Sequence, residues 1–260
     1  MNDRTATPSL PASDMPPDLS PASAALVEDL VAANHILSDQ GIVDAFGHVS
    51  VRHDKDPSRF LLARNMAPGN VTAADIVQYT HDGTPLDAGD RRVYLERFIH
   101  GAIYRERPDV MAVVHSHSPS VLPFTVVPKA RFRPICHMSG FLGAGAPRFE
   151  IRDTAGDASD LLVSDDRLGR ALAGSLGGAN FVLMRGHGST TVAPSLKLVV
   201  YRAVYAEVNA KLSLQALQLG EPEYLTDGEA RTAMASTEGQ VERPWALWKA
   251  DAQRRRATST

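Results

Sequence analysis

Val113-Val114-His115-Ser116-His117 is an apolar stretch that ends in two histidines one residue apart, and it decides how the fold is predicted. Side chains alternate between the two faces of a β-strand, so His115 and His117 point to one side and Ser116 to the other. Two imidazoles on one face are half of a metal site. A lone histidine more often only satisfies hydrogen bonds, so the metal interpretation depends on finding further ligands.

A third histidine follows a second apolar stretch, Phe181-Val182-Leu183-Met184. It lies in Arg185-Gly186-His187-Gly188, where the glycines predict a turn that leaves His187 exposed at the end of another strand. Three histidines with one vacant coordination position are what a catalytic divalent metal requires. The sequence therefore predicts that His115, His117 and His187 bind one metal ion.

Composition limits the classes of protein to consider. The chain has 260 residues, of which 43% are hydrophobic, and nothing divides it cleanly, so we expect a single domain over residues 22–260. The formal net charge is -3 and the basic residues are scattered apart from Arg254-Arg255-Arg256, so nucleic acid is not an expected partner. Cys136 is the only cysteine, so the metal must rest on nitrogen and oxygen ligands.

The N-terminal segment differs from the rest of the chain. Residues 1–21 carry five prolines among Ser, Asp and Ala, which predicts a disordered leader. No apolar run approaches the roughly 18 residues that span a bilayer, and the N-terminus lacks a secretory signal pattern. We therefore expect a soluble cytoplasmic protein that does not interact with membranes.

Apolar periodicity predicts the elements of residues 22–260. Strands are expected over residues 48–52, 59–63, 76–80, 111–117 and 180–184, the first two of them forming a hairpin. Helices are expected over residues 22–40, 91–105, 118–122, 164–176 and 194–217, followed by one or two short helices that end near residues 245–251. Glu96 falls on the second of these helices. Short strands interleaved with helices predict an α/β sandwich in which helices cover a mixed sheet.

Four segments together resemble the class II aldolase/adducin family over about residues 24–220: Glu96, Arg107-Pro108-Asp109, Ala112-Val113-Val114-His115-Ser116-His117 and Arg185-Gly186-His187-Gly188. The conjunction is specific because the glutamate lies eleven residues before the Arg-Pro-Asp segment and the third histidine some seventy residues after the pair. The resemblance implies a three-layer α/β/α fold with a mixed, mostly antiparallel sheet, and a homotetramer with active sites between subunits. It also implies His115, His117 and His187 as metal ligands and Glu96 as the acid/base.

The chemistry of these residues agrees with that resemblance. A metal on three neutral imidazoles keeps its full positive charge and can stabilise an enolate-like oxygen when a carbon-carbon bond breaks. A nearby glutamate can then move a proton to or from the carbon. Most glutamates on helices are simply solvated, but the apolar neighbours of Glu96 favour a catalytic role. Zinc is the default for three histidine ligands, and manganese, cobalt or iron would fit the same set. No organic cofactor is expected.

Three segments depart from the sugar-phosphate members of that family, which hold phosphate with small hydroxyls and bare amides. The corresponding residues here are Ala45-Phe46-Gly47-His48-Val49-Ser50, Leu62-Ala63-Arg64-Asn65 and Tyr94-Leu95. A phosphorylated sugar is therefore a poor prediction. The replacements suit a flat, acidic, partly apolar molecule, because aromatic side chains can cover a ring and an arginine can pair with a carboxylate.

The expected substrate is a small carboxylic acid. A glycine-bounded loop over residues 135–143 adds His137, Met138 and Phe141, and with Arg64-Asn65 it resembles the decarboxylase branch of the family, which acts on hydroxylated aromatic or pyridine dicarboxylic acids. Arg64 can equally form a surface ion pair, and packing can explain Met138 and Phe141. The predicted substrate-binding residues are Phe46, His48, Ser50, Arg64, Asn65, Tyr94 and Phe141.

The predicted reaction is therefore a metal-dependent, non-oxidative decarboxylation. Glu96, or His137 if its loop closes over the site, protonates the ring carbon after carbon dioxide leaves. The nearest alternative is a retro-aldolase that cleaves an unphosphorylated hydroxy-keto acid with the same metal and glutamate. A third interpretation is an adducin-like assembly module without catalysis, which the presence of all three histidines and Glu96 disfavours.

Overall fold

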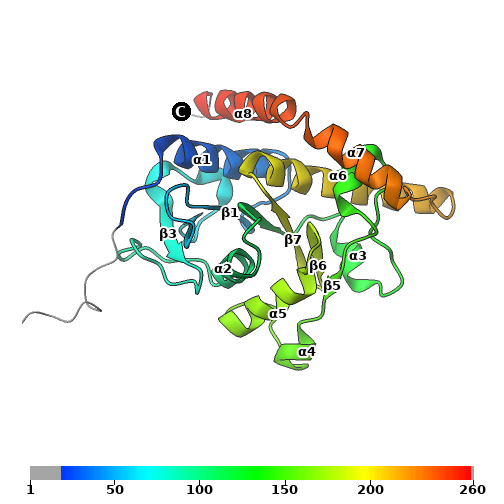
Figure 1. Ribbon diagram of the computed structural model, residues 1–260, viewed down its shortest axis with the longest axis horizontal. Coiled ribbons are helices and arrows are strands. Elements are labelled where there is room, and N and C mark those ends of the chain that lie inside the picture. The colour runs from blue at the N-terminus through cyan, green and yellow to red at the C-terminus, as the bar shows by residue number, and fades with distance from the viewer. Residues whose placement is uncertain (1–18, 259–260) are drawn as a thin grey trace, which may run out of the picture.

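Seven strands form one mixed sheet in the order β3-β2-β1-β4-β7-β6-β5 in the computed structural model, which describes residues 19–258 (Figure 1). Six of the strands are paired antiparallel and only β5 runs parallel to its neighbour β6. The strands are β1 (His48–Arg52), β2 (Arg59–Ala63), β3 (Ile76–Thr80), β4 (Ala112–Ser116), β5 (Arg148–Phe149), β6 (Phe181–Met184) and β7 (Gly188–Ala193). The predicted hairpin of β1 and β2 and the mostly antiparallel sheet are confirmed.

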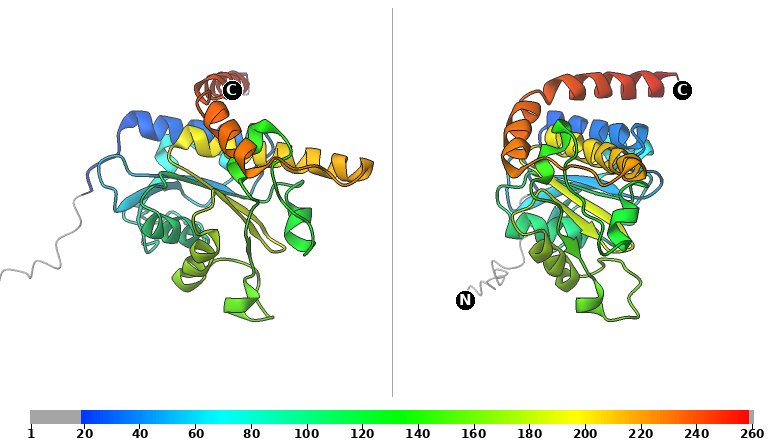
Figure 2. Two further views of the ribbon diagram at one scale, coloured as in Figure 1. Left: turned by 45° about the vertical axis from the view of Figure 1, so that its right-hand side comes forward. Right: turned by 90° about the vertical axis from the view of Figure 1, so that its right-hand side faces the viewer.

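Helices cover both faces of this sheet, which confirms the three-layer α/β/α architecture (Figures 1 and 2). One face carries α1 (Ala24–Asp39) and α6 (Leu196–Leu219), with α8 (Glu242–Ala257) packed outside them. The other face carries α2 (Arg97–Glu106) and α5 (Asp166–Leu176). Each face therefore has its own hydrophobic core. The remaining helices are α3 (Leu122–Val126), α4 (Arg152–Ala155), α7 (Asp227–Glu238) and the 3-10 helices η2 (Pro68–Asn70), η3 (Ala73–Asp75) and η4 (His137–Leu142).

Side-chain caps explain where several helices begin. Ser23, Asp165 and Ser195 each accept a hydrogen bond from the backbone amide three residues ahead, at the N-termini of α1, α5 and α6. Thr226 and Glu229 form a reciprocal capping box at the start of α7. These caps satisfy amides that the helix itself leaves free, so the local sequence fixes the first turn of each helix.

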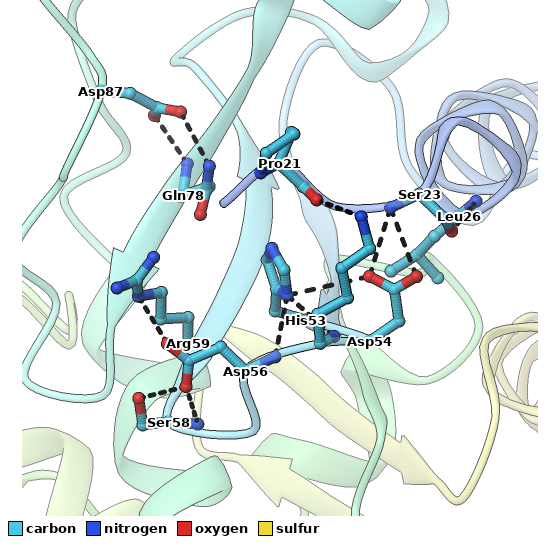
Figure 3. Close-up of polar contacts among 11 residues, drawn as sticks. Pro21, Ser23, Leu26, His53, Asp54, Asp56, Ser58, Arg59, Gln78 and Asp87 are labelled. Carbon is cyan, nitrogen blue, oxygen red and sulfur yellow. Dashed lines mark hydrogen bonds and ion pairs between the residues drawn. The ribbon is translucent and has the colours of Figure 1, made fainter. Parts of the chain in front are cut away.

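The loop between β1 and β2 is tied to the start of α1 (Figure 3). Asp54 accepts from the amide of Ser23, and the Nζ of Lys55 donates to the carbonyl of Pro21 at 2.8 Å. The Nδ1 of His53 accepts from the amides of Lys55 and Asp56, both at 3.1 Å. These bonds fix the far end of β1, the strand whose first residue is His48.

Several predicted boundaries were wrong. Helix α2 begins at Arg97 rather than at residue 91, because tertiary hydrogen bonds hold the preceding segment in a non-helical path: Arg92 accepts from the amide of Asn65, and the Tyr94 hydroxyl donates to the carbonyl of Met66. Glu96 is consequently the N-cap residue of α2 and not part of its body. The helix expected over residues 118–122 instead forms as α3, where Pro123 occupies the first turn.

Other elements are new or longer than expected. The short β5 and the central β7 were not predicted, and α7 and α8 are longer than the helices expected at the C-terminal end. The predicted leader over residues 1–21 lies almost entirely outside the described residues. Within residues 19–258, no helix combines the length and the apolar character needed to cross a bilayer.

Candidate active site

Four side chains meet where β4 ends and α2 begins. The ligand atoms of Glu96, His115, His117 and His187 all lie within 4.8 Å of one another. The Nε2 of His117 lies 3.1 Å from the Nε2 of His115 and 3.1 Å from that of His187. Ligands of a tetrahedral zinc ion, each roughly 2.0–2.1 Å from the metal, have about this separation. Since neutral imidazole nitrogens repel one another at this range unless a cation or proton lies between them, the donor set fits a divalent metal.

Two glycines allow the strands that carry these histidines to approach closely. A Cβ on Gly188 would lie 2.2 Å from the carbonyl oxygen of Ser116, and one on Gly47 would lie 3.0 Å from that of His115. Gly47 also has a φ of 88°, which disfavours any other residue. The glycines beside His48 and His187 are thus explained by the packing around β4.

The orientation of His187 is set by the loop before α5. Its Nδ1 lies 2.9 Å from the carbonyl oxygen of Leu161. Because that oxygen can only accept, Nδ1 carries the proton and Nε2 presents its lone pair to the other histidines. Leu161 itself has a φ of 71°. The carbonyl that orients His187 therefore belongs to a strained residue.

Glu96 is buried beside the histidines. Its Oε1 accepts from the amide of Val163 at 3.0 Å, and its Oε2 lies 3.5 Å from the Nε2 of both His115 and His187. Burial alone would raise the pKa of Glu96, but the neighbouring imidazoles of His115 and His187 outweigh it and hold the pKa well below its usual range. Glu96 is therefore a carboxylate at rest, which suits it to bind a cation.

The histidines differ in electrostatics. Burial lowers the pKa of His115 and His117, which favours the neutral form that binds metals. Burial also opposes a charge on His187, but the hydrogen bond and the negative charge of Glu96, together with the carbonyl of Leu161 and the charge of Asp160, outweigh burial and raise the pKa of His187. A metal ion at this site would take the place of a proton on the Nε2 of His187.

A cavity of about 270 Å³ opens beside the cluster. Phe46 and Leu95, exposed by 68% and 60%, lie at its mouth. The ring of Tyr94 stands 4.7 Å from that of His48 on the inner wall. The lining residues are Ala45, Phe46, Gly47, His48, Asn65, Met66, Ala67, Tyr94, Leu95, Glu96, His117 and Leu162. The structure thus brings Phe46, His48, Asn65 and Tyr94 together with Glu96 and His117.

Arg64 and Ser50 lie outside the lining of this cavity. Arg64 forms an ion pair with Asp75, with 2.6 Å between Nε and Oδ1, and its side chain is 38% exposed. Arg64 is still close enough to affect the electrostatics of the Tyr94 hydroxyl. Ser50 is fully buried, and its hydroxyl contacts His100 and Tyr104.

His137 and Phe141 lie elsewhere in this protomer. Both belong to η4, which packs against α7 and α6. His137 faces a different cavity, of about 650 Å³, which Tyr201, Tyr205 and Trp248 also line. Phe141 is buried in the core on the α1 and α6 face. The protomer therefore does not bring these two residues to Glu96.

Several contributors were missed by the sequence interpretation. Met66 and Leu162 line the cavity, and the carbonyl of Leu161 orients His187. His100 and Tyr104 contact His48 and Ser50 from α2. His100 and Tyr104 are four residues apart and so share one helical face, and His48 and Ser50 share one strand face. These two spacings were the signal in the sequence that could have identified the contact.

The match to a known family agrees with this site. Residues 28–214 match the model of the class II aldolase and adducin N-terminal domain. The chain therefore belongs to the class II aldolase and adducin family.

Two relatives that cover most of the chain are named decarboxylases. The chain is 37% identical over 245 residues to the decarboxylase TropJ of Talaromyces stipitatus, covering 85% of this chain and 92% of the relative. It is 29% identical to the 3,4-dihydroxyphthalate decarboxylase of Arthrobacter keyseri, covering 74% and 79%. Among solved structures, the L-fuculose 1-phosphate aldolase of Glaciozyma antarctica matches with a TM-score of 0.72 at 21% identity, covering 90% and 94%. That structure supports the fold, and the sequence relatives support a lyase of the decarboxylase branch.

Proposed function

We propose that this protein is a divalent-metal-dependent decarboxylase that removes carbon dioxide, without oxidation, from a hydroxylated aromatic or pyridine dicarboxylic acid. The observation that carries the proposal is the cluster of Glu96 and three histidines at the wall of an aromatic-lined cavity. The names of the two decarboxylase relatives point in the same direction.

The cavity suits a single-ring acid. Its volume of about 270 Å³ is just below the usual range for drug-sized ligands, which matches a small substrate. Tyr94, Phe46 and Met66 offer apolar and aromatic surface for a ring. Phe46 is mostly exposed in the protomer, as expected of a side chain that a ligand or a neighbouring subunit covers.

His115, His117 and His187 would hold the metal, with Glu96 available as a fourth ligand. A bound divalent cation would supply positive charge that stabilises the negative charge left on the substrate when carbon dioxide departs. We propose zinc on the basis of the nitrogen-rich donor set, with manganese, cobalt or iron as alternatives.

Glu96 is proposed to carry the proton. As a carboxylate at rest it can accept the proton of the ring hydroxyl when the substrate binds. After the carbon-carbon bond breaks, the electron pair left on the ring carbon takes that proton back from Glu96, and carbon dioxide leaves. The ring oxygen regains a proton from water on release, so the reaction consumes one proton overall.

The second carboxylate of the substrate needs a cation at the rim. Arg64 uses its Nε for Asp75, and its two terminal nitrogens have no hydrogen-bond partner within residues 19–258. They remain available to pair with a carboxylate in two-point fashion. Asn65, which lines the cavity next to Arg64, adds an amide to the same rim.

The test is to assay the metal-loaded full chain against a panel of hydroxylated aromatic and pyridine dicarboxylates and to measure carbon dioxide release. We expect activity that falls at least about a hundredfold in Glu96→Gln, because general acid/base catalysis typically contributes that much. Full activity of that variant would contradict the role of Glu96, and no carbon dioxide from any acid would contradict the proposal.

The same assay separates the alternatives. A retro-aldolase would release an aldehyde or ketone from an unphosphorylated hydroxy-keto acid and no carbon dioxide. An adducin-like assembly module would bind no metal, and chelation would leave its stability unchanged.

A further inference from the structure

A chain of four buried side chains runs from the cavity into the core between β1 and α2. The Nδ1 of His48 lies 2.6 Å from the Nε2 of His100, and the Nδ1 of His100 lies 2.6 Å from the Oγ of Ser50. The Ser50 hydroxyl lies 2.7 Å from the hydroxyl of Tyr104. All four residues are at most 4% exposed, so water does not compete for these bonds.

The arrangement follows from two sequence periods. Residues 48 and 50 share one face of β1, and residues 100 and 104 share one face of α2. The ring of Phe60 packs against those of His100 and Tyr104, at centroid distances of 6.2 and 5.3 Å, and covers one side of this chain of hydrogen bonds. The four groups are therefore held in place by the packing of a helix on a strand.

Tyr104 sets the direction of these hydrogen bonds. Burial raises the pKa of Tyr104, so its hydroxyl keeps its proton and must donate it. Within the described residues, Ser50 is the one acceptor in reach of that hydroxyl. Ser50 therefore accepts from Tyr104 and turns its own hydrogen toward the Nδ1 of His100. The opposite direction would leave the Tyr104 hydrogen buried without an acceptor, which is costly.

The direction of these hydrogen bonds also determines which nitrogen of His48 carries the proton. Burial lowers the pKa of His100 to about 3, so its ring is neutral and carries one proton. With Nδ1 accepting from Ser50, His100 bears its proton on Nε2 and donates it to the Nδ1 of His48. His48 must then carry its own proton on Nε2.

The Nε2 of His48 faces the cavity. His48 lines that cavity, and the only hydrogen bond of its side chain within residues 19–258 uses Nδ1. Its Nε2 is also absent from the fully buried atoms without a partner in that range. We propose that Tyr104, Ser50 and His100 are positioning residues that lock His48 as a hydrogen-bond donor through Nε2, aimed at an anionic oxygen of the substrate.

The inference rests on the proposed function only for the nature of the acceptor, a carboxylate or phenolate oxygen. A histidine free to change tautomer would present a lone pair to that oxygen in part of the molecules. The locked form presents N–H in all of them. His48 thereby selects acidic, oxygen-rich ligands and disfavours ligands that offer only donors.

The direct test is to read the tautomers by solid-state ¹⁵N NMR of the zinc-loaded full chain labelled at histidine. The signals are assigned with His48→Gln and His100→Gln. We expect both rings to show a protonated Nε2 and an unprotonated Nδ1. A protonated Nδ1 on His48 in the unmodified protein would overturn the proposal, whatever the enzyme activity.

Variants at the chain provide the second test. Ser50→Ala removes the hydroxyl that connects Tyr104 to His100, so we expect a mixture of tautomers at His48. The KM should rise by up to about tenfold, because His48 would lose part of a hydrogen bond to a charged group of the substrate. Ser50→Thr restores a hydroxyl and should restore the single tautomer. A single Nε2-protonated form in Ser50→Ala would overturn the lock.

Tyr79→Phe is the matched control. The hydroxyl of Tyr79 is buried and lacks a hydrogen-bond partner within the described residues. The ring of Tyr79 stacks on the same Phe60, but Tyr79 takes no part in the hydrogen bonds from Tyr104 to His48. We expect both the tautomers and the KM of Tyr79→Phe to be unchanged. Failure of every carboxylate substrate would contradict the proposed function, whereas the NMR result would stand independently.

Discussion

Leu161 combines an uncommon backbone conformation with a role beside the metal site. Its φ of 71° is one that a leucine rarely adopts and typically costs about 1–3 kcal/mol. Its carbonyl oxygen is 2.9 Å from the Nδ1 of His187 and thereby fixes the imidazole with Nε2 toward His117. The strain is thus stored where it selects one tautomer of a candidate ligand.

His117 provides the test of the metal site at the scale of one residue. Its Nε2 lies 3.1 Å from those of both His115 and His187, so His117→Ala removes one of the three nitrogen donors. We expect the purified variant to bind zinc at least about tenfold more weakly, because each ligand nitrogen contributes more than one hydrogen bond's worth of energy. Metal content by mass spectrometry checks this. His137→Ala, at an exposed histidine of another cavity, is the control, and equal zinc in both variants would contradict the assignment.

At the scale of elements, two glycines in α5 differ in what surrounds them. A Cβ on Gly169 would lie 2.5 Å from the carbonyl oxygen of Phe98 on α2, whereas one on Gly174 would meet nothing within 4 Å. We expect Gly169→Ala to lower the free energy of unfolding by about 1–3 kcal/mol through overpacking. Gly174→Ala should raise it by about 0.5–1 kcal/mol, since alanine favours helices.

Urea unfolding of the two variants measures both effects with the same substitution in one helix. Equal changes in midpoint would contradict the close packing of α2 against α5. Because α2 carries Glu96 at its start and His100 along its body, Gly169→Ala should also reduce activity more than Gly174→Ala does.

The elements that could be predicted are those with clear periodicity. Strands β1, β2, β3, β4 and β6 alternate or are continuously apolar, and the sequence placed each to within a residue or two. Strand β7 was missed because its core is Ser189-Thr190-Thr191, polar side chains that lie buried in the centre of the sheet. The start of α2 was missed because contacts with residues 65 and 66, far away in sequence, hold the preceding segment.

The site divides in the same way. The three histidines and Glu96 could be predicted because their spacing along the sequence resembles that of a known family, and the structure brings them into one cluster. Leu161, Leu162 and Met66 reach the site through loops whose paths depend on tertiary packing, and no local pattern marks them. Ser50 shares a face of β1 with His48 but lies further along the strand, where His100 and Tyr104 of α2 cover it, and this depends on packing and not on composition.

At the scale of the whole molecule, acid should weaken the fold through buried histidines. The pKa of His100 is lowered to about 3, chiefly by burial, whereas an unfolded histidine titrates near 6.5. Above about pH 6.5 the neutral ring contributes its full stability. Between pH 6.5 and 3 the unfolded chain binds a proton that the folded chain does not, so stability falls by about 1.4 kcal/mol per pH unit.

Urea midpoints at pH 7, 6 and 5, measured with chelator present so that metal release does not contribute, check this slope. The pKa of His48 is lowered as well, so His48 makes stability fall more steeply with acid. In His100→Gln, the loss of stability per pH unit should be smaller by about 1.4 kcal/mol, the contribution of one proton. Identical slopes would show that His100 is protonated in the folded state.

The assembly remains a prediction at this scale. The C-terminal end of α6 projects from the body of the protomer (Figure 2), and its Leu217 and Leu219 are 48% and 92% exposed. Exposed leucines on a projecting helix favour a subunit contact. We expect light scattering to give about four times 28.0 kDa, and a smaller species for Leu217→Glu with Leu219→Glu. A wild-type mass of one chain would contradict the tetramer.

The split origin of the histidine ligands has a consequence for how the protein matures. His115 and His117 come from β4, and His187 from the turn that joins β6 to β7, with β4 and β7 paired side by side. A slip of one residue in that pairing would turn His115 to the wrong face, so only correctly registered chains would take up metal tightly. Metal uptake would then act as a checkpoint on sheet assembly, and the fraction of a preparation that binds metal would measure the fraction correctly folded.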